Sequence, residues 1–524
     1  MKMQILYEDD ARRALEKGIS TVSEAVAVTI GPKGRNVVLA KTLQSPQIIN
    51  DGVTIAKEIY LQDSVQNMGA LLVKEAASKT NAIAGDGTTT STILAYSIIQ
   101  QGLKYLSSGI DAISLKKGIT KSVNFVIDQI LECARPVQNS LDMIQIASIS
   151  ANNDTVIGQI IAEAFSQAGR EGIISLEEGN STFTELEIME GMQFEKGFMS
   201  PYFSSDKDTM SATKQNPYLL LTDQTLSSIQ KEIIPILEIA IKAKKPLIII
   251  AKDIEQKALA TLVMNKLKNK IDIIAVKAPG FGAEVNNFLE DMCTLTDGIL
   301  ISKESGIRFN NLKIEMFGRA RQVTVDKNIT TIIADRNKAA VENRCIALRK
   351  QIESSDSFYE KEKLESRLAK LSGGVSVIKI GAATEIEMRE KKLRFEDAIN
   401  ATKAAIAEGI IPGGGSTLAH TSIRLQEWAR KSLRGDEQIG ALIIAIAIAM
   451  PLKRIASNSG ENGAFILNQL GKYPSNIGYN AIDNTFNDLF DIGVIDPVKV
   501  TRSALQNAAS VASMILTTEC VVPE

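Results

Sequence analysis

The spacing of apolar residues divides the chain into helical ends and a mixed middle. Residues from about 8 to 133, and from about 385 to the end, repeat apolar positions at helical intervals. The stretches GPKGRNVVLA and PQIINDGVTIA interrupt the first region with a Gly or Pro turn beside a short β-rich run. In the middle, PLIIIAKD and IDIIAVKAPG are predicted to be buried strands separated by helices. The pattern predicts a multidomain fold with helical terminal segments and an α/β centre.

The regions between these parts are also patterned. EGIISLEEGNSTFTELEIMEGMQF alternates as strands do, and VSVIKIGAA is a predicted strand. RNKAAVENRCIALRKQIESSDSFYEKEKLESRLAKL is charged and amphipathic, which predicts an antiparallel helix pair. Helical ends around such a middle indicate an outer domain interrupted by a second domain, which is itself interrupted by a third. Gly191 and Gly373–Gly374 lie at the two crossings, where they are expected as hinges or as simple strand-end turns.

Composition narrows the class of protein. With 524 residues, 44% apolar and 23% charged, the chain is an ordinary globular protein of roughly three domains. A net charge of −2 gives no basic excess for nucleic acid. The run IGALIIAIAIAMPL is too short to span a membrane and is expected to be a buried helix. The opening MKMQILYEDDARR is expected to be neither a signal nor a transit peptide.

Few residue types remain for chemistry. The four cysteines form no CxxC pair, which suits a reducing compartment and gives no zinc spacing. His420 is the single histidine, so His-based triads and multi-His metal centres are not expected. Catalysis would therefore depend on carboxylates, hydroxyls, backbone groups and a hard cation.

The segment GDGTTT at 85–90 lies between two predicted helices. Its glycines allow close backbone approach, its threonines add donors, and Asp86 can hold a cation at a helix start. These features fit a metal-bound polyphosphate. The six residues fit equally well a Gly-broken junction in which Asp86 or Thr88 caps the second helix.

Four further stretches carry similar chemistry: TIGPKGRNV (29–37), NDGVT (50–54), EGIIPGGGSTL (408–418) and IGVIDPVKV (492–500). None is a P-loop or a GxGxxG fingerprint, and each alone is more typical of a turn. Their joint presence in the helical ends favours one shared nucleotide pocket. Asp51 and Asp86 precede glycines in loops that a nucleotide could approach, whereas the residue pattern around Asp397 indicates a solvated helical acid.

Two middle-region helices have surplus apolar surface. In KEIIPILEIAIKAKK the apolar positions cover more than half of the helix circumference, and DIEQKALATLVMNKLKNK carries two apolar stripes. This surplus indicates either packing on two sides or a binding site for apolar partners.

The sequence resembles the type I chaperonins, the GroEL family. The motifs that carry the resemblance run in family order from residue 11 to residue 520, and include TIGPKGRNVVL, NDGVTIAKEI, AGDGTTT, MEGMQF, VKAPGFG, LSGGVSVIKIGAATEIEMREKK, EDAINATKAAIAEGI, PGGG, GYNA, DPVKVTRSALQNAAS and TTEC. The resemblance implies a mostly helical equatorial ATP-binding domain over 1–133 and 409–524, a small α+β intermediate hinge domain over 134–190 and 375–408, and an inserted α/β apical domain over 191–374.

The resemblance also implies site residues. Asp86 would be the Mg²⁺ ligand, and Asp51 and Asp397 would act in hydrolysis. The resemblance therefore makes Asp397 a candidate catalytic residue despite its sequence pattern. The remaining implied ATP contacts are Thr29, Ile30, Gly31, Pro32, Asn50, Gly87, Thr88, Thr89, Thr90, Gly414, Asn480, Ala481, Ile482 and Asp496. K⁺ is an expected second cation, although Asn50 replaces a usual lysine.

In the apical domain, the residues implied to bind unfolded polypeptide and the co-chaperonin are Phe198, Tyr202, Phe203, Ile234, Leu237, Leu259, Val263 and Met264. The implied activity is an ATP-driven folding chaperone, a homo-oligomer of two stacked seven-membered rings with a GroES-type cap. No nucleic-acid or membrane partner is expected. The alternative is a metabolic ATPase or phosphotransferase that shares Asp-Gly phosphate loops. The opening ILYEDDARRALEKG, the Ile- and Asn-rich composition and the absence of a Gly-Gly-Met tail favour the plastid stroma over the bacterial cytoplasm.

Overall fold

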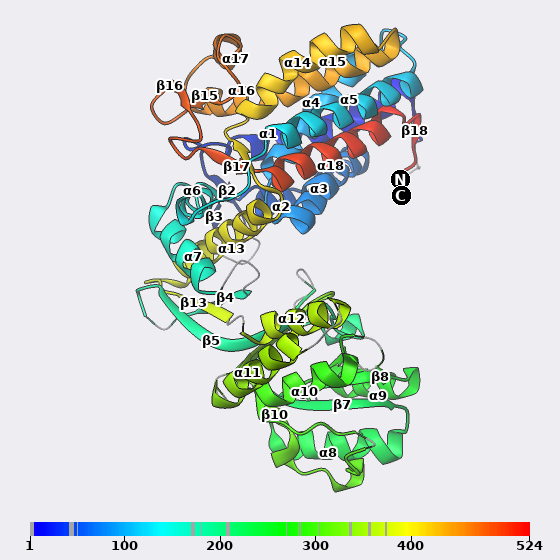
Figure 1. Cartoon of the computed structure of the whole chain (residues 1–524). Helices are drawn as coiled ribbons and strands as arrows, with labels where there is room; N and C mark the ends of the chain where they lie inside the picture. Colours follow the sequence, from blue (N-terminus) through cyan, green and yellow to red (C-terminus); the bar gives the residue numbers. More distant parts are fainter. Residues whose placement is uncertain are drawn as a thin grey trace. The chain divides into compact units, whose positions relative to one another are not determined.

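The chain forms two compact units, residues 1–163 with 389–524, and residues 164–388. We call the first the helical unit and the second the α/β unit, and describe each by itself (Figure 1). The computed structural model describes residues 5–40, 47–49, 51–168, 173–179, 181–205, 210–268, 270–280, 282, 284–302, 304–334, 338–354, 358–372 and 375–523.

Long helices pack side by side in the helical unit (Figure 1). They are α1 (Glu8–Ala27), α3 (Ser64–Ala84), α4 (Thr88–Leu106), α5 (Ala112–Glu132), α14 (Ser416–Ser432), α15 (Asp436–Ile448) and α18 (Val498–Leu516). On α1, residues Leu15, Ile19 and Val22 are buried at helical spacing. A Cβ at Gly69 would lie 2.2 Å from the Leu15 carbonyl oxygen, so glycine allows α1 and α3 to approach closely.

The most apolar stretch of the chain belongs to this core. The helical run Asp436–Asn458, which contains α15 and α16 (Met450–Asn458), is long and apolar enough to cross a membrane by length and composition alone. However, 67% of its most apolar window is buried inside the protein. The prediction of a buried helix is confirmed, but the expectation that the run is too short to span a membrane is wrong, because the helical run continues past Pro451 to Asn458.

Short strands join distant parts of the helical unit. The pairs are β1 (Leu6–Tyr7) with β18 (Cys520–Val521), β2 (Val37–Leu39) with β3 (Gln47–Ile49), β14 (Ile410–Pro412) with β17 (Ile495–Pro497), and β15 (Ile477–Asn480) with β16 (Thr485–Asp488). β2 and β3 confirm the β-rich runs expected at the two interruptions. The remaining helices are α2 (Gly52–Glu58), α6 (Ser140–Ser150) and α17 (Gly463–Leu470), with α7 (Thr155–Ala168) and α13 (Glu385–Glu408) extending past the unit's limits.

Two sheets form the α/β unit. One has the order β4-β13-β5-β12-β11-β6 and the other β10-β7-β8-β9. Their strands are β4 (Ile173–Glu178), β5 (Glu185–Phe194), β6 (Ala212–Gln215), β7 (Tyr218–Leu226), β8 (Leu247–Ile254), β9 (Ile273–Lys277), β10 (Gly318–Arg319), β11 (Gln322–Val325), β12 (Thr330–Ala334) and β13 (Val375–Ile380). The apolar runs of β8 and β9 are buried strands, as predicted, and the two strands pair in parallel.

Helices cover these sheets. They are α8 (Ile234–Ala243), which follows a π turn at Ile229–Ile233, α9 (Gln256–Leu267), α10 (Glu284–Thr296), α11 (Lys338–Ser354) and α12 (Phe358–Ser372), with a 3₁₀ turn at Pro201–Phe203. α11 and α12 form the predicted helix pair. Both helices hold α10, because the buried carboxylate of Asp291 accepts hydrogen bonds from Arg344 and Arg367.

The predicted domain limits are only partly visible. Helical ends around an α/β middle are confirmed, but the division into three domains stays a prediction, since the contacts separate two units. Gly191 lies inside β5 opposite Ile333, so the strand-end turn expected there is wrong. Gly373 and Gly374 lie outside the described residues.

Candidate functional site

The GDGTTT segment forms the junction between α3 and α4. Gly85 ends α3 with φ 72° and Gly87 precedes α4 with φ 86°, both in the left-handed region that favours glycine. Gly87 is the N-cap residue and no side chain caps the helix, so the prediction that Asp86 or Thr88 is the cap is wrong. The Asp86 carboxylate instead accepts hydrogen bonds from the Gly87 N–H and, at 3.2 Å, from the Ser150 hydroxyl.

The three threonines form the first turn of α4, which begins at Thr88. Free N–H groups and the positive end of the helix dipole at this turn favour an anion. A buried network supports the turn from behind: the Asn507 amide donates to the Thr80 hydroxyl at 3.0 Å, and Thr80 donates to Ser91 at 3.2 Å. These bonds join α18, α3 and α4 beneath the junction.

The second Asp-Gly segment lies beside the first. The Asp51 carboxylate caps α2 by accepting hydrogen bonds from the Val53 and Thr54 N–H groups at 3.0 and 2.9 Å. A Cβ at Gly52 would lie 2.4 Å from the Thr89 hydroxyl oxygen, so only glycine allows this approach. The starts of α2 and α4 therefore meet.

Two later segments complete the group of carboxylates. The pairing of β14 with β17 places Gly413 against Asp496, because a Cβ at Gly413 would lie 2.9 Å from the Asp496 Oδ1. Asn400 on α13 lies against Gly85, because a Cβ there would be 2.2 Å from the Asn400 Cβ. Asp397 lies nearly one turn earlier on α13 and is half-buried.

Burial and mutual repulsion raise the pKa values of three of the carboxyl groups in this site. Burial raises the pKa of Asp86, and the charge of Asp51 raises it further. The pKa of Asp397 lies well above its usual value because of burial and the charges of Asp86 and Asp51. Burial, with the charge of Asp86, raises the pKa of Asp496 to about 6. The prediction of a solvated helical acid at position 397 is therefore wrong, since the site surrounds it with other acids.

Such a group of repelling carboxylates fits a bound cation. Within the described ranges, no three His, Cys, Asp or Glu side chains are arranged to hold a metal ion alone. Mg²⁺ usually keeps several waters and takes oxygens from substrate phosphates, so one or two carboxylates beside an anion-binding helix start are suitable donors. Asn50, expected to contribute to cation binding, lies outside the described residues.

Two further predicted ATP contacts lie in an apolar cluster of the helical unit. Ile30 and Ala481 pack in one apolar cluster with Leu452, Ile455 and Tyr479. The Asn458 amide holds the adjacent loop by donating to the Ile30 carbonyl at 2.9 Å.

The other residues of this predicted set lie in the same loops. Gly31 and Gly414 have φ 89° and 60°, and Thr29 donates its hydroxyl to the Val26 carbonyl. The Asn480 side chain accepts the Ile482 N–H at 3.0 Å. Pro32 and Ile482 are exposed. The structure thus brings the predicted nucleotide residues that it describes into one region of the helical unit.

Sequence reasoning missed the residues that support the loop. Ser150 binds Asp86 from 64 positions away, and Asn507 binds Thr80 from 427 positions away. Neither pair has a local sequence signal, because the partners are brought together only by helix packing.

The predicted polypeptide-binding residues divide by exposure. Tyr202, Ile234 and Met264 are 65, 42 and 49% exposed. Phe198, Leu259 and Val263 are partly buried against the core of the α/β unit. The expectation of a surface position is wrong for the remaining two residues, because Phe203 is fully buried and Leu237 is buried. Leu237 lies on the inward stripe of its helix with Ile233 and Ala240.

The chain matches known proteins both in sequence and in fold. A family model described as the TCP-1/cpn60 chaperonin family matches residues 22–524. The chain is also similar in fold to the crystal structure of the chaperonin gp146 from the bacteriophage EL 2 (Pseudomonas aeruginosa), obtained in the presence of ATP-BeFx. The TM-score is 0.69 at 20% sequence identity, covering 100% of this chain and 99% of the phage protein.

Proposed function

The chain belongs to the TCP-1/cpn60 chaperonin family, and on that basis we propose that its carboxylate-lined site binds and hydrolyses Mg²⁺·ATP to drive the capture and release of non-native polypeptides. ATP hydrolysis and ATP-dependent protein folding are properties of this family. The observation that carries the proposal is the convergence of Asp51, Asp86 and Asp397 beside the first turn of α4.

Each part of the site has a separate task. The free N–H groups at Thr88–Thr90 bind phosphate oxygens, and the left-handed glycines let the backbone come close. Asp86 is the metal ligand, and the Ser150 hydroxyl fixes its carboxylate. A bound Mg²⁺ would neutralise phosphate charge. Asp397, whose pKa is raised, orients the attacking water and accepts a proton from it. Asp51 assists from beside it.

We place polypeptide binding on the exposed apolar side chains of the α/β unit, Tyr202, Ile234 and Met264. This proposal is supported by the exposure of these side chains on segments whose other residues pack into the core of the α/β unit. Such packing holds the exposed apolar surface in place. Leu259 and Val263 form the half-buried margin of this surface.

The assembly and partners extend the same proposal. We propose two stacked heptameric rings closed by a GroES-type co-chaperonin, with K⁺ as a second cation and the plastid stroma as the compartment, the bacterial cytoplasm being the alternative. The support is the resemblance of the motifs to type I chaperonins. The family match across residues 22–524 favours this function over a metabolic phosphotransferase.

One experiment tests the proposal. ATP turnover and particle size are measured together, by phosphate release and electron microscopy, with and without an unfolded client. A chaperonin gives a large ring-shaped particle whose turnover changes with the client. A small particle that requires a small-molecule phosphate acceptor would contradict the proposal.

A further inference from the structure

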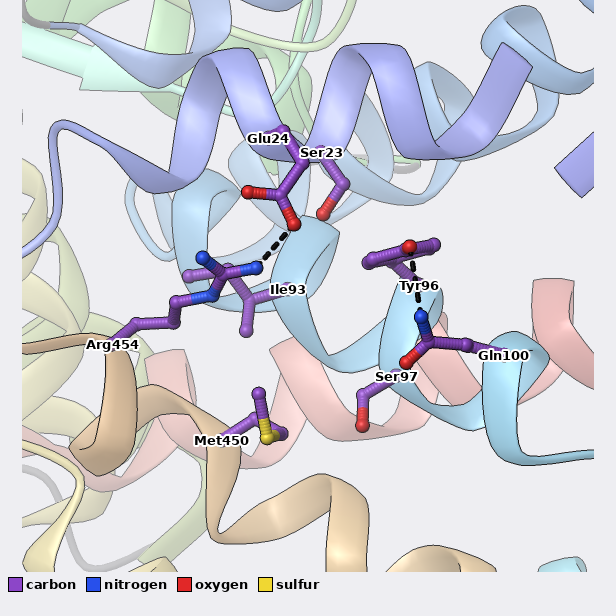
Figure 2. Close-up of a pocket in the computed structure, with 8 residues that line it drawn as sticks. All are labelled: Ser23, Glu24, Ile93, Tyr96, Ser97, Gln100, Met450 and Arg454. Carbon is purple, nitrogen blue, oxygen red and sulfur yellow. Dashed lines mark hydrogen bonds and ion pairs between the residues drawn. The ribbon is translucent and has the colours of Figure 1, made fainter. Parts of the chain in front are cut away.

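A cavity of about 60 Å³ with both polar and apolar walls lies in the helical unit between α1, α4 and α16, apart from the carboxylate site (Figure 2). Ser23 of α1 and Ser97 of α4 both line it and are 2 and 4% exposed. Among the described residues, neither hydroxyl has a hydrogen-bond partner, although buried serines in helices commonly bond to a carbonyl one turn earlier. Both hydroxyl oxygens are open to the cavity and are not enclosed by packed protein atoms, so an occupant of the cavity can form hydrogen bonds with them.

Further polar groups surround the same space. The Tyr96 hydroxyl interacts with Ser20 at 3.2 Å and with the Gln100 amide nitrogen at 3.0 Å. This bond fixes the Gln100 side chain and leaves its carbonyl oxygen as an acceptor (Figure 2). The cavity therefore offers hydroxyl groups and an amide oxygen, which together can donate and accept hydrogen bonds.

The cavity carries no net charge. The Glu24 carboxylate and the Arg454 guanidinium pair with each other at its edge, where both side chains are partly exposed. Their mutual pairing leaves little attraction for a free cation or anion. An occupant held by this cavity is therefore uncharged.

The remaining wall is apolar. Ile93 and the thioether side chain of Met450 line the cavity. Separate waters against such a wall would lose hydrogen bonds, and each would also lose some freedom. A molecule whose hydroxyl groups are connected by carbon atoms can form hydrogen bonds with the polar wall and apolar contacts with the other wall. At about 10–15 Å³ for each water-sized group, the cavity accepts roughly four to six such groups.

We propose that this cavity is a binding site for a small uncharged polyol of the size of ethylene glycol or glycerol, with its hydroxyls on Ser23, Ser97 and Gln100. The occupant contacts α1, which ends two residues before Thr29, and α4, which begins at Thr88. It also contacts α16, which carries Ile455 of the apolar cluster that contains Ile30 and Ala481. Polyol binding therefore stabilises the packing of these three helices. A resulting change in ATP turnover is also expected, and this part rests on the proposed function.

The test uses the purified full-length protein and glycerol as the probe. Sorbitol is the control solute, because it is too large for the cavity yet stabilises proteins by the same general exclusion from their surface. Thermal unfolding is followed against solute concentration for the wild type and three variants. Ser97→Leu fills the cavity, Ser23→Ala removes one hydroxyl without filling it, and Ser107→Leu repeats the leucine substitution at an exposed position after α4.

Wild type and Ser107→Leu should show a saturable glycerol-dependent rise in melting temperature of about 2 °C above the linear effect of sorbitol. Ser97→Leu should lose this component, and Ser23→Ala should need severalfold more glycerol. If Ser97→Leu fails to fold, Ser23→Ala decides the result. Identical linear curves for all proteins would mean an adventitious additive only and overturn the proposal. Because unfolding is measured without nucleotide, this outcome is independent of whether ATP is hydrolysed.

Discussion

The Ser150 hydroxyl donates to the Asp86 carboxylate at 3.2 Å, linking the end of α6 to the loop between α3 and α4. This bond favours the charged form of Asp86, whereas burial disfavours it.

Asp86→Asn should weaken Mg²⁺-dependent ATP binding strongly, because a neutral amide is a poor ligand for a hard dication. Ser150→Ala should weaken it about threefold to tenfold, the scale of one ordinary hydrogen bond. Calorimetric titration with ATP at several Mg²⁺ concentrations checks both, and an unchanged Mg²⁺ dependence in Asp86→Asn would remove this residue from the metal.

Asp397 lies among other carboxylates but on a separate helix from the phosphate loop. Asp397→Ala should leave ATP binding largely intact and slow turnover by about two orders of magnitude, the scale of losing one positioned catalytic group. Single-turnover hydrolysis and nucleotide binding are measured on the same preparation. A collapse of affinity with normal turnover of the bound nucleotide would show that Asp397 acts in binding instead.

The raised pKa of Asp496, about 6, predicts how nucleotide affinity depends on pH. A cation favours the ionised carboxylate, so below about pH 6 its binding must displace a proton. Mg²⁺·ATP affinity should therefore be constant above pH 7 and fall by up to about tenfold per pH unit below 6. Asp496→Asn should remove its share of this dependence and leave the share due to Asp86 and Asp397, whose pKa values are also raised. Proton release on binding, measured at pH 6 in buffers of different ionisation enthalpy, gives an independent check; equal heats in all buffers would exclude the coupling.

Exposure separates the apolar residues of the α/β unit into two groups that mutation can distinguish. Leu237→Ser buries a hydroxyl and opens a cavity, which should cost about 2–5 kcal/mol of unfolding free energy. Met264→Ser changes an exposed side chain and should cost less than about 0.5 kcal/mol while weakening client capture. Thermal unfolding and binding of an unfolded client are compared on both variants. A destabilised Met264→Ser with unchanged capture would contradict the proposed surface.

Lys266 ties α9 to the Pro201–Phe203 turn, since its ammonium group donates to the Phe203 carbonyl. Burial lowers its pKa to about 8, and the charge of Lys214 lowers it further while Asp272 opposes the shift. Between about pH 8 and the ordinary pKa of lysine, the unfolded chain therefore binds more protons at this position than the folded protein does. Stability should rise with pH over that interval through this group, and Lys266→Met should lose that increment. Urea unfolding at pH 7.5 and 9.5 measures it; equal increments in both proteins would rule out Lys266 as the source.

Periodicity alone determined much of this molecule. The helices that flank GDGTTT, the buried strands β8 and β9 and the α11–α12 pair all follow from side-chain spacing, because burial of one face is a local requirement. The glycines at 85 and 87 were expected to allow close backbone approach, and the structure gives both the left-handed conformation that few other residues adopt.

Only the tertiary structure decided which side chains share an environment. Asp397 has the sequence pattern of a solvated acid, yet the approach of α13 to Gly85 places it among Asp51 and Asp86. Leu237 and Met264 are both apolar helical residues, yet the sheet beneath buries one and leaves the other exposed. Ser150 and Asn507 acquire their roles from partners distant in sequence. Burial and charge coupling depend on distances in space, and sequence spacing constrains those distances only within one helix or strand.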